Sequence, residues 1–206
     1  MNNIVITIGR EYGSGGKYIG QKLADALNIP FYDKEIINKT YEKNGCNYSK
    51  LEEYDEVKRN GIIKLLNLIS TGSNEMAFND DTYQTLISST ITSLADTGSC
   101  IILGRNSNKI LKDRKNVINI FIYSNNLEFK IGRKMEIENI SYEEAYSRLK
   151  EVDKMRKRYY ESQDKSNSWG NARDYDYLID SSILGIDGTV ELIKDIYIKY
   201  SEKDLC

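Results

Sequence analysis

The chain has no histidine among its 206 residues. This absence excludes a Ser-His-Asp triad, a Cys-His nucleophile pair and zinc sites with histidine ligands. Any chemistry must therefore come from Asp, Glu, Lys, Arg or Tyr side chains, from backbone amides, or from a recruited metal ion. We expect no metal site built from side chains alone.

Cysteine, proline and long apolar runs are also scarce. Cys46, Cys100 and Cys206 are scattered without a CxxC spacing, which is typical of a reducing compartment and argues against structural zinc. No apolar run is long enough to span a membrane, and the N-terminus leads directly into a strand pattern rather than a signal peptide. These features predict a cytoplasmic protein.

The charges nearly cancel: 29 basic and 31 acidic side chains give a formal net charge of −2. This balance argues against a protein that coats nucleic acid or an anionic membrane. Apolar residues make up 40% of the chain, which is enough to build a core, and the length fits one globular domain.

Short apolar runs typical of buried parallel strands alternate with helical patterns along the chain. The predicted strands cover residues 4–8, 31–32, 100–103, 117–123 and 177–180. The predicted helices cover 17–27, 83–94, 127 onward, 141–160 and 189–200. Asp33, Ser124 and Ser141 are the expected N-caps of helices near Lys34, Leu127 and Tyr142. The alternation predicts a three-layer α/β domain with a mostly parallel sheet flanked by helices.

Four glycines between residues 9 and 16 join the first strand to the first helix. Glycine lets the main chain curl tightly enough for several N–H groups to face one anion, and a helix N-terminus adds partial positive charge. Gly13-Ser14-Gly15-Gly16-Lys17 therefore predicts phosphate binding, although a glycine-rich turn can also merely connect the two elements. The strict pattern GxxxxGK[ST] is not met, because Glu11 replaces its first glycine and Tyr18 replaces its Ser or Thr.

The segment VITIGREYGSGGKYIGQKLADAL at residues 5–27 aligns without a gap with the opening of bacterial cytidylate kinases. Gly104-Arg105-Asn106 resembles their Gly-Arg-Asp, and the spacing of Asp153 and Arg156 resembles the Asp-x-x-Arg of their lid. The closing segment DYLIDSSILGIDGTVELI also matches, so only about residues 44–80 lack a counterpart. The chain looks closest to the cytidylate kinase-like group, whose first turn reads like REYGSGG.

The resemblance implies a three-layer P-loop NTPase fold over residues 1–206, with one domain and a helical lid insert. The acceptor-binding region would lie at about residues 33–98 and the lid at about 141–173. The implied activity is phosphoryl transfer from ATP, with Mg²⁺, to a nucleoside monophosphate, CMP first. The implied partners are small-molecule nucleotides, with neither nucleic acid nor membrane involved.

The same resemblance assigns roles to individual residues. The donor phosphates would lie on Gly13, Ser14, Gly15, Gly16, Lys17 and Tyr18, with Lys17 or Arg10 as the cation. The acceptor site would use Asp33, Lys34, Lys39, Arg105, Asn106 and Asp153. Charge on the migrating group would be neutralised by Arg133, Arg156 and Arg158, because phosphoryl transfer depends mainly on positioning and electrostatics.

The chain departs from the family pattern at the positions that hold phosphate. Gly16 falls where the kinases have their catalytic lysine, Lys17 comes one residue later, and Arg10 replaces a glycine. Asn106 replaces an acid, and residues 80–98 lack the basic residue that holds the acceptor phosphate. These departures leave open a kinase with a different small acceptor, and also a regulatory module that binds a nucleotide without turning it over.

Overall fold

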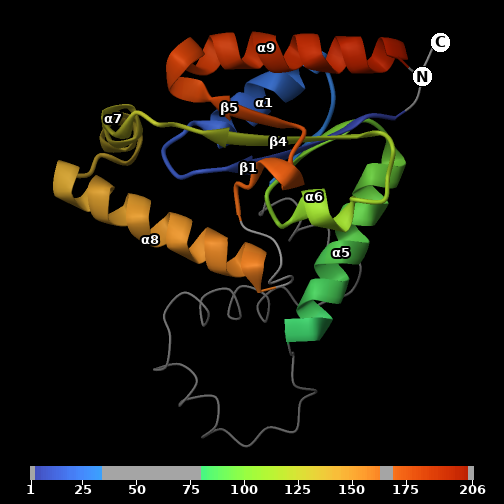
Figure 1. The fold of residues 1–206 in the computed structure, drawn as a ribbon, viewed down its shortest axis with the longest axis horizontal. Helices are drawn as coiled ribbons and strands as arrows, with labels where there is room; N and C mark the ends of the chain where they lie inside the picture. The colour runs from blue at the N-terminus through green and yellow to red at the C-terminus, as the bar shows by residue number, and fades with distance from the viewer. Residues whose placement is uncertain (1–2, 34–79, 163–168, 204–206) are drawn as a thin grey trace, which may run out of the picture.

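The computed structural model describes residues 3–33, 80–162 and 169–203 (Figure 1). The helix expected near Lys34, and with it the capping role predicted for Asp33, lies outside these described residues.

Five parallel strands form one sheet in the order β2-β3-β1-β4-β5. Their bounds are Val5–Arg10 (β1), Phe31–Tyr32 (β2), Cys100–Leu103 (β3), Val117–Tyr123 (β4) and Tyr177–Asp180 (β5). β1 lies in the centre, with Ile6 beside Ile101 on β3 and beside Ile118 on β4. The five predicted strands are confirmed, and the strand that leads into the glycine-rich turn is the central one.

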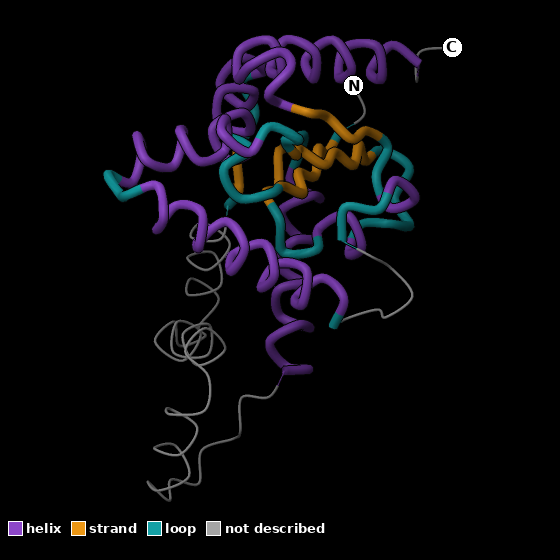
Figure 2. The backbone as a smooth tube through the Cα atoms, turned by 60° about the vertical axis from the view of Figure 1, so that its left-hand side comes forward, coloured by secondary structure: helices purple, strands orange, loops and turns teal. Residues whose placement is uncertain are grey.

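Helices cover both faces of this sheet. Their bounds are Gly16–Leu27 (α1), Asp80–Thr97 (α5), Ser107–Ile110 (α6), Leu127–Glu138 (α7), Tyr142–Glu161 (α8) and Ser181–Lys203 (α9). α1 and α9 lie on one face, α5 and α6 lie on the other, and α7 and α8 extend beside the carboxyl end of the sheet (Figures 1 and 2). The predicted three-layer α/β architecture is therefore confirmed. Within the described residues, no helix combines the length and apolar character needed to cross a membrane.

Alternate side chains of the buried strands pack into two apolar cores, one on each face of the sheet. On the α1 and α9 side, Ile6 packs in one cluster with Leu23 and Ile193, all fully buried. On the α5 side, Val5 joins a second cluster with Ile91. A strand buried on both faces needs apolar residues at consecutive positions, which explains the β-branched run of β1.

The first residues of the helices test the N-caps predicted from the sequence. Ser141 caps α8 as predicted, because its hydroxyl accepts a hydrogen bond from the Glu144 N–H. The cap predicted at Ser124 is wrong: the Asn126 side chain accepts from Phe129 N and caps α7. α9 begins at Ser181, earlier than expected, with a break in helical geometry at Gly185.

Ile193 and Ile198 on α9 offer a matched test of the layer that α9 forms with α1. Ile193 is fully buried, whereas Ile198 is 41% exposed. We expect Ile193→Ala to lower the free energy of unfolding by about 2–5 kcal/mol, because the smaller side chain leaves a cavity. Ile198→Ala should change it by less than about 0.5 kcal/mol. Urea denaturation followed by circular dichroism measures both, and equal effects would contradict this packing.

Candidate active site

The turn between β1 and α1, residues 11–15, is held in a shape that requires glycine. Gly13 and Gly15 have φ angles of 82° and 83°, in the left-handed region. A Cβ on Gly13 would lie 2.8 Å from the Cβ of Lys130 on α7, so the backbone approaches that helix closely. This turn is called the phosphate loop below, for the hypothesis that its sequence generated.

The backbone N–H groups from Gly13 in the phosphate loop to Lys17 in α1 are available to a ligand. Within the described residues, the N–H groups of residues 13–17 donate no hydrogen bond to the protein. The loop lines a pocket of about 700 Å³, called the loop pocket here, to which Gly13, Gly15 and Gly16 contribute. Unpaired amides at a helix N-terminus that face a hollow are an anion-binding arrangement.

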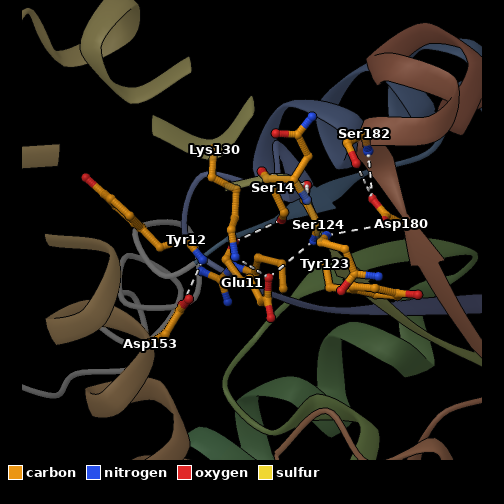
Figure 3. Close-up of polar contacts among 12 residues, drawn as sticks. Glu11, Tyr12, Ser14, Tyr123, Ser124, Lys130, Asp153, Asp180 and Ser182 are labelled. Carbon is orange, nitrogen blue, oxygen red and sulfur yellow. Dashed lines mark hydrogen bonds and ion pairs between the residues drawn. The ribbon is translucent and has the colours of Figure 1, made fainter. Parts of the chain in front are cut away.

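Buried polar contacts fix the loop from behind (Figure 3). Glu11 Oε2 lies 2.9 Å from Lys130 Nζ and accepts a hydrogen bond from Ser124 N at 3.2 Å. The Ser14 hydroxyl donates to the Glu11 carbonyl at 2.9 Å, and Ser181 Oγ donates to the Ser14 carbonyl at 2.7 Å. The loop is thus tied to the ends of β4 and β5 and to α7 before any ligand is present.

Arg10 ends β1, and its side chain crosses from Gly16 to Gly104. A Cβ on Gly16 would lie 2.6 Å from Arg10 Cβ, and a Cβ on Gly104 would overlap Arg10 Nη1. Among the described residues, the Arg10 guanidinium makes no hydrogen bond or ion pair. Burial, with Arg156 and Arg105 nearby, lowers the Arg10 pKa to about 9. A desolvated cation in this state favours an anionic ligand.

Lys17 also lines the loop pocket, but its ammonium group is paired with an acid. Its ammonium group lies 2.8 Å from Asp33 Oδ2 at the end of β2, and its side chain is about half exposed. The two cations that the sequence left as alternatives therefore occupy different places: Arg10 lies inside the loop region, and Lys17 pairs with an acid beside it.

Asp153 and Arg156 on α8 contact the loop backbone. Asp153 Oδ1 accepts a hydrogen bond from Tyr12 N at 2.7 Å, and Arg156 Nη1 donates to the Arg10 carbonyl at 3.0 Å. The two side chains are 3.5 Å apart. Burial raises the pKa of Asp153 to about 6 and lowers the pKa of Arg156, so each charge is costly without its partner.

A second pocket, of about 510 Å³, lies beside the first and is called the arginine pocket here. Four arginines line it, with four aromatic side chains: Arg10, Arg105, Arg156, Arg158, Tyr159, Tyr160, Trp169 and Tyr175. Among the described residues, no acidic side chain joins this lining. Arg10 and Arg156 line both pockets, so they lie where groups bound in the two pockets would meet.

The two pockets gather most of the residues that the sequence singled out. The loop pocket contains Arg10, Gly13, Gly15, Gly16, Lys17, Tyr18, Arg133 and Arg156. The arginine pocket contains Arg10, Arg105, Asn106, Arg156 and Arg158. Ser14 and Asp153 make the loop contacts given above, and Lys34 and Lys39 lie outside the described residues.

Asn106 was predicted for the acceptor site, and Tyr12 and Gly104 have contacts that the sequence did not predict. Asn106 is buried and donates to the Tyr159 carbonyl at 3.4 Å, which joins α6 to the end of α8. The sequence assigned no role to Tyr12, and it pointed to Gly104 only as part of the Gly-Arg-Asn motif, without a role of its own. Their importance comes from contacts with distant parts of the chain, which a local pattern does not carry.

The raised pKa of Asp153 makes anion binding depend on pH. Below about pH 6 the carboxyl group is protonated and neutral, so the net positive charge around Arg156 and Arg10 increases. Sulfate keeps its two charges across this range, and we expect it to bind about three to ten times more tightly near pH 5 than near pH 7.5. Isothermal titration calorimetry measures this, and Asp153→Asn should flatten the profile. A flat profile in the unmodified protein would contradict the assignment.

Comparison with solved structures supports the fold. The crystal structure of an uncharacterized protein from Eubacterium ventriosum is 27% identical, has a TM-score of 0.68, and is matched over 94% of this chain and 98% of that one. The YorR protein from Bacillus subtilis, solved in complex with phosphorylated GDP, is 10% identical with a TM-score of 0.50, over 97% and 98% of the two chains. No curated protein gives a significant match.

The sequence itself places the chain in a family. The model of the cytidylate kinase-like family matches residues 5–183, which include β1, the phosphate loop, both pockets and β5. The parallel sheet with its central β1 and glycine-rich turn is the P-loop fold. The chain belongs to the cytidylate kinase-like family.

Proposed function

We propose that the protein transfers the γ-phosphoryl group of ATP to a nucleoside monophosphate, with CMP as the first acceptor to test. The observation that carries this proposal is the position of Arg10. Its guanidinium, which makes no hydrogen bond or ion pair with the described residues, lies beside the phosphate loop, next to the place where the family has its lysine. It also lines both pockets. One cation can therefore act on the donor and on the acceptor.

The donor would bind with its phosphates on the amides of residues 13–17. Arg133, half-buried beside Gly15, would add a second cation in the loop pocket. The acceptor would place its anionic group among the arginines of the arginine pocket, and a planar ring would find aromatic side chains there, Trp169 and Tyr175 among them. Lys34 and Lys39 remain proposed acceptor residues on the strength of the sequence alone.

In the reaction, a phosphate oxygen of the acceptor bonds to the γ-phosphorus of ATP. The bond from that phosphorus to the oxygen that bridges the β-phosphate breaks, and ADP leaves with the electron pair. No side-chain base is needed, because the acceptor oxygen is already anionic at neutral pH. Arg10 and Arg156 neutralise charge as it spreads over the migrating group, and Arg158 would add to this at the rim of the arginine pocket.

Mg²⁺ usually binds to one or two carboxylates together with the phosphates of the substrate, rather than in a protein cage. Within the described residues, no group of three acidic or thiol ligands comes together. Tyr18, at the position of the usual Ser or Thr, is half exposed and lies against Lys22. Asp33 is a buried carboxylate close to Lys17 and Arg10, and it fits the role of a single protein ligand. A bound Mg²⁺ would offset the charge of the donor phosphates.

A kinase of the same fold with a different small acceptor is the second candidate. Two observations favour it: the Asn106 amide is engaged with the Tyr159 carbonyl, and residues 80–98 contain no basic side chain. The arginine pocket still requires such an acceptor to be anionic.

A coupled kinase assay with CMP, UMP, dCMP, AMP and GMP as acceptors tests the proposal. Matched variants of Arg10 and Lys17 test whether Arg10 is the cation on which it rests. Arg10→Met should lower kcat and kcat/KM together by about a hundredfold or more, because the cation acts mainly in the transition state. Lys17→Met, which removes a half-exposed cation paired with Asp33, should cost less than about tenfold. Near-normal turnover by Arg10→Met would refute the mechanism. ATP binding without turnover of any acceptor would favour a non-catalytic module.

A second test moves the cation from position 10 to position 16. Gly16→Lys alone should lose activity, because its Cβ would meet Arg10 Cβ at 2.6 Å. Arg10→Gly combined with Gly16→Lys removes that collision and places a lysine at the family position. The double variant should recover at least about tenfold in kcat/KM over Gly16→Lys. If it recovers nothing, the two side chains do not substitute for one another.

A further inference from the structure

Tyr12, the second residue of the phosphate loop, contacts both helices of the α7–α8 pair. Its hydroxyl donates to the carboxylate of Glu138, the last residue of α7, with both oxygens 2.7 Å away. Its ring packs against a small apolar cluster formed by Ile131 on α7 and by Ala145 and Leu149 on α8. The residue therefore joins the loop to two helices through one side chain.

Glu138 connects this contact to charged groups of both helices. Its carboxylate lies 2.6 Å from Lys134 Nζ on α7 and 2.8 Å from Arg148 Nη1 on α8. Lys134 Nζ also lies 4.0 Å from the centre of the Tyr12 ring. The lowered pKa of Glu138 and the raised pKa of Tyr12, about 12, agree with a phenol that donates to an ionised carboxylate.

The backbone of the same loop segment is attached to α8 as well. Tyr12 N donates to Asp153 (Figure 3), and the carbonyl of Arg10 accepts from Arg156. Arg156, which lines both pockets, is therefore placed by where α8 lies against the loop. Anything that fixes α8 on the loop also fixes this cation.

We propose that Tyr12 is a positioning residue that holds the α7–α8 pair on the phosphate loop, so that Arg156 is in place before ligands bind. The resemblance to the family led us to expect a lid over about residues 141–173, which include α8. With Tyr12 in place, the conformational cost of ordering α8 is met during folding rather than in each catalytic cycle. The catalytic consequence rests on the proposed kinase function, whereas the structural part does not.

Hydrogen exchange of the ligand-free protein tests the structural part. Tyr12→Phe keeps the ring in its apolar cluster and removes the hydroxyl. Tyr142→Phe is the matched control, because its hydroxyl also joins α8 to α7, through Glu128 at 3.0 Å, but at an exposed site. We expect amides of α8 between about residues 145 and 158 to exchange about ten times faster in Tyr12→Phe and at the normal rate in Tyr142→Phe. Equal exchange in the two variants would overturn the proposal.

Kinetics test the catalytic part. Tyr12→Phe should lower kcat about tenfold while ATP affinity, measured by calorimetry, changes by less than about threefold, because the hydroxyl donates to Glu138 on α7 and the variant keeps the loop backbone. Tyr142→Phe should match the unmodified protein in both. A loss confined to ATP affinity would overturn the positioning role. If the unmodified protein turns over no acceptor, the kinase proposal fails, and hydrogen exchange alone then decides whether Tyr12 fixes α8.

Discussion

A steric constraint organises the carboxyl end of the sheet: the side chain of Arg10 fits only because Gly16 and Gly104 carry no Cβ. The first glycine begins α1 and the second follows β3, so the room for one guanidinium is provided by two elements that both contact β1. The phosphate loop, the end of β3 and the helix α8 that donates to the Arg10 carbonyl all take their places around this side chain. Both pockets open on it.

The charges around Arg10 are balanced only in part. Arg105 and Arg156 lower its pKa, while Asp33 and Asp153 act in the opposite direction. A buried cation with this surplus of neighbouring positive charge lowers the stability of the folded protein, and a phosphate bound there would offset that cost. The loop beside these cations is held in place by Glu11, which pairs with Lys130, and by Tyr12, which donates to Glu138. A loosely held cluster of like charges would move apart instead.

The fold could be predicted well from the sequence because its signals are local. β-branched runs such as residues 4–8 identified the buried strands, and the Ser141 capping box identified the start of α8. The cap of α7 was missed because Ser124 and Asn126 are both good capping residues, and only the geometry of the turn selects Asn126. The sequence predicted which residues belong to the candidate site, but not which of them contact one another. Whether Arg10 or Lys17 faces the loop depends on Gly104 and Asp33, and nothing near residue 12 in the sequence points to Glu138.

The mutual exclusion of a side chain at position 16 and the arginine at position 10 has an evolutionary consequence. A loop with lysine at position 16 and glycine at position 10 cannot be converted into this one by a single favourable change. Adding the arginine first produces a collision, and removing the lysine first leaves the phosphates without their cation. The effect of a substitution at one of these positions therefore depends on the residue at the other, so the two positions are epistatic.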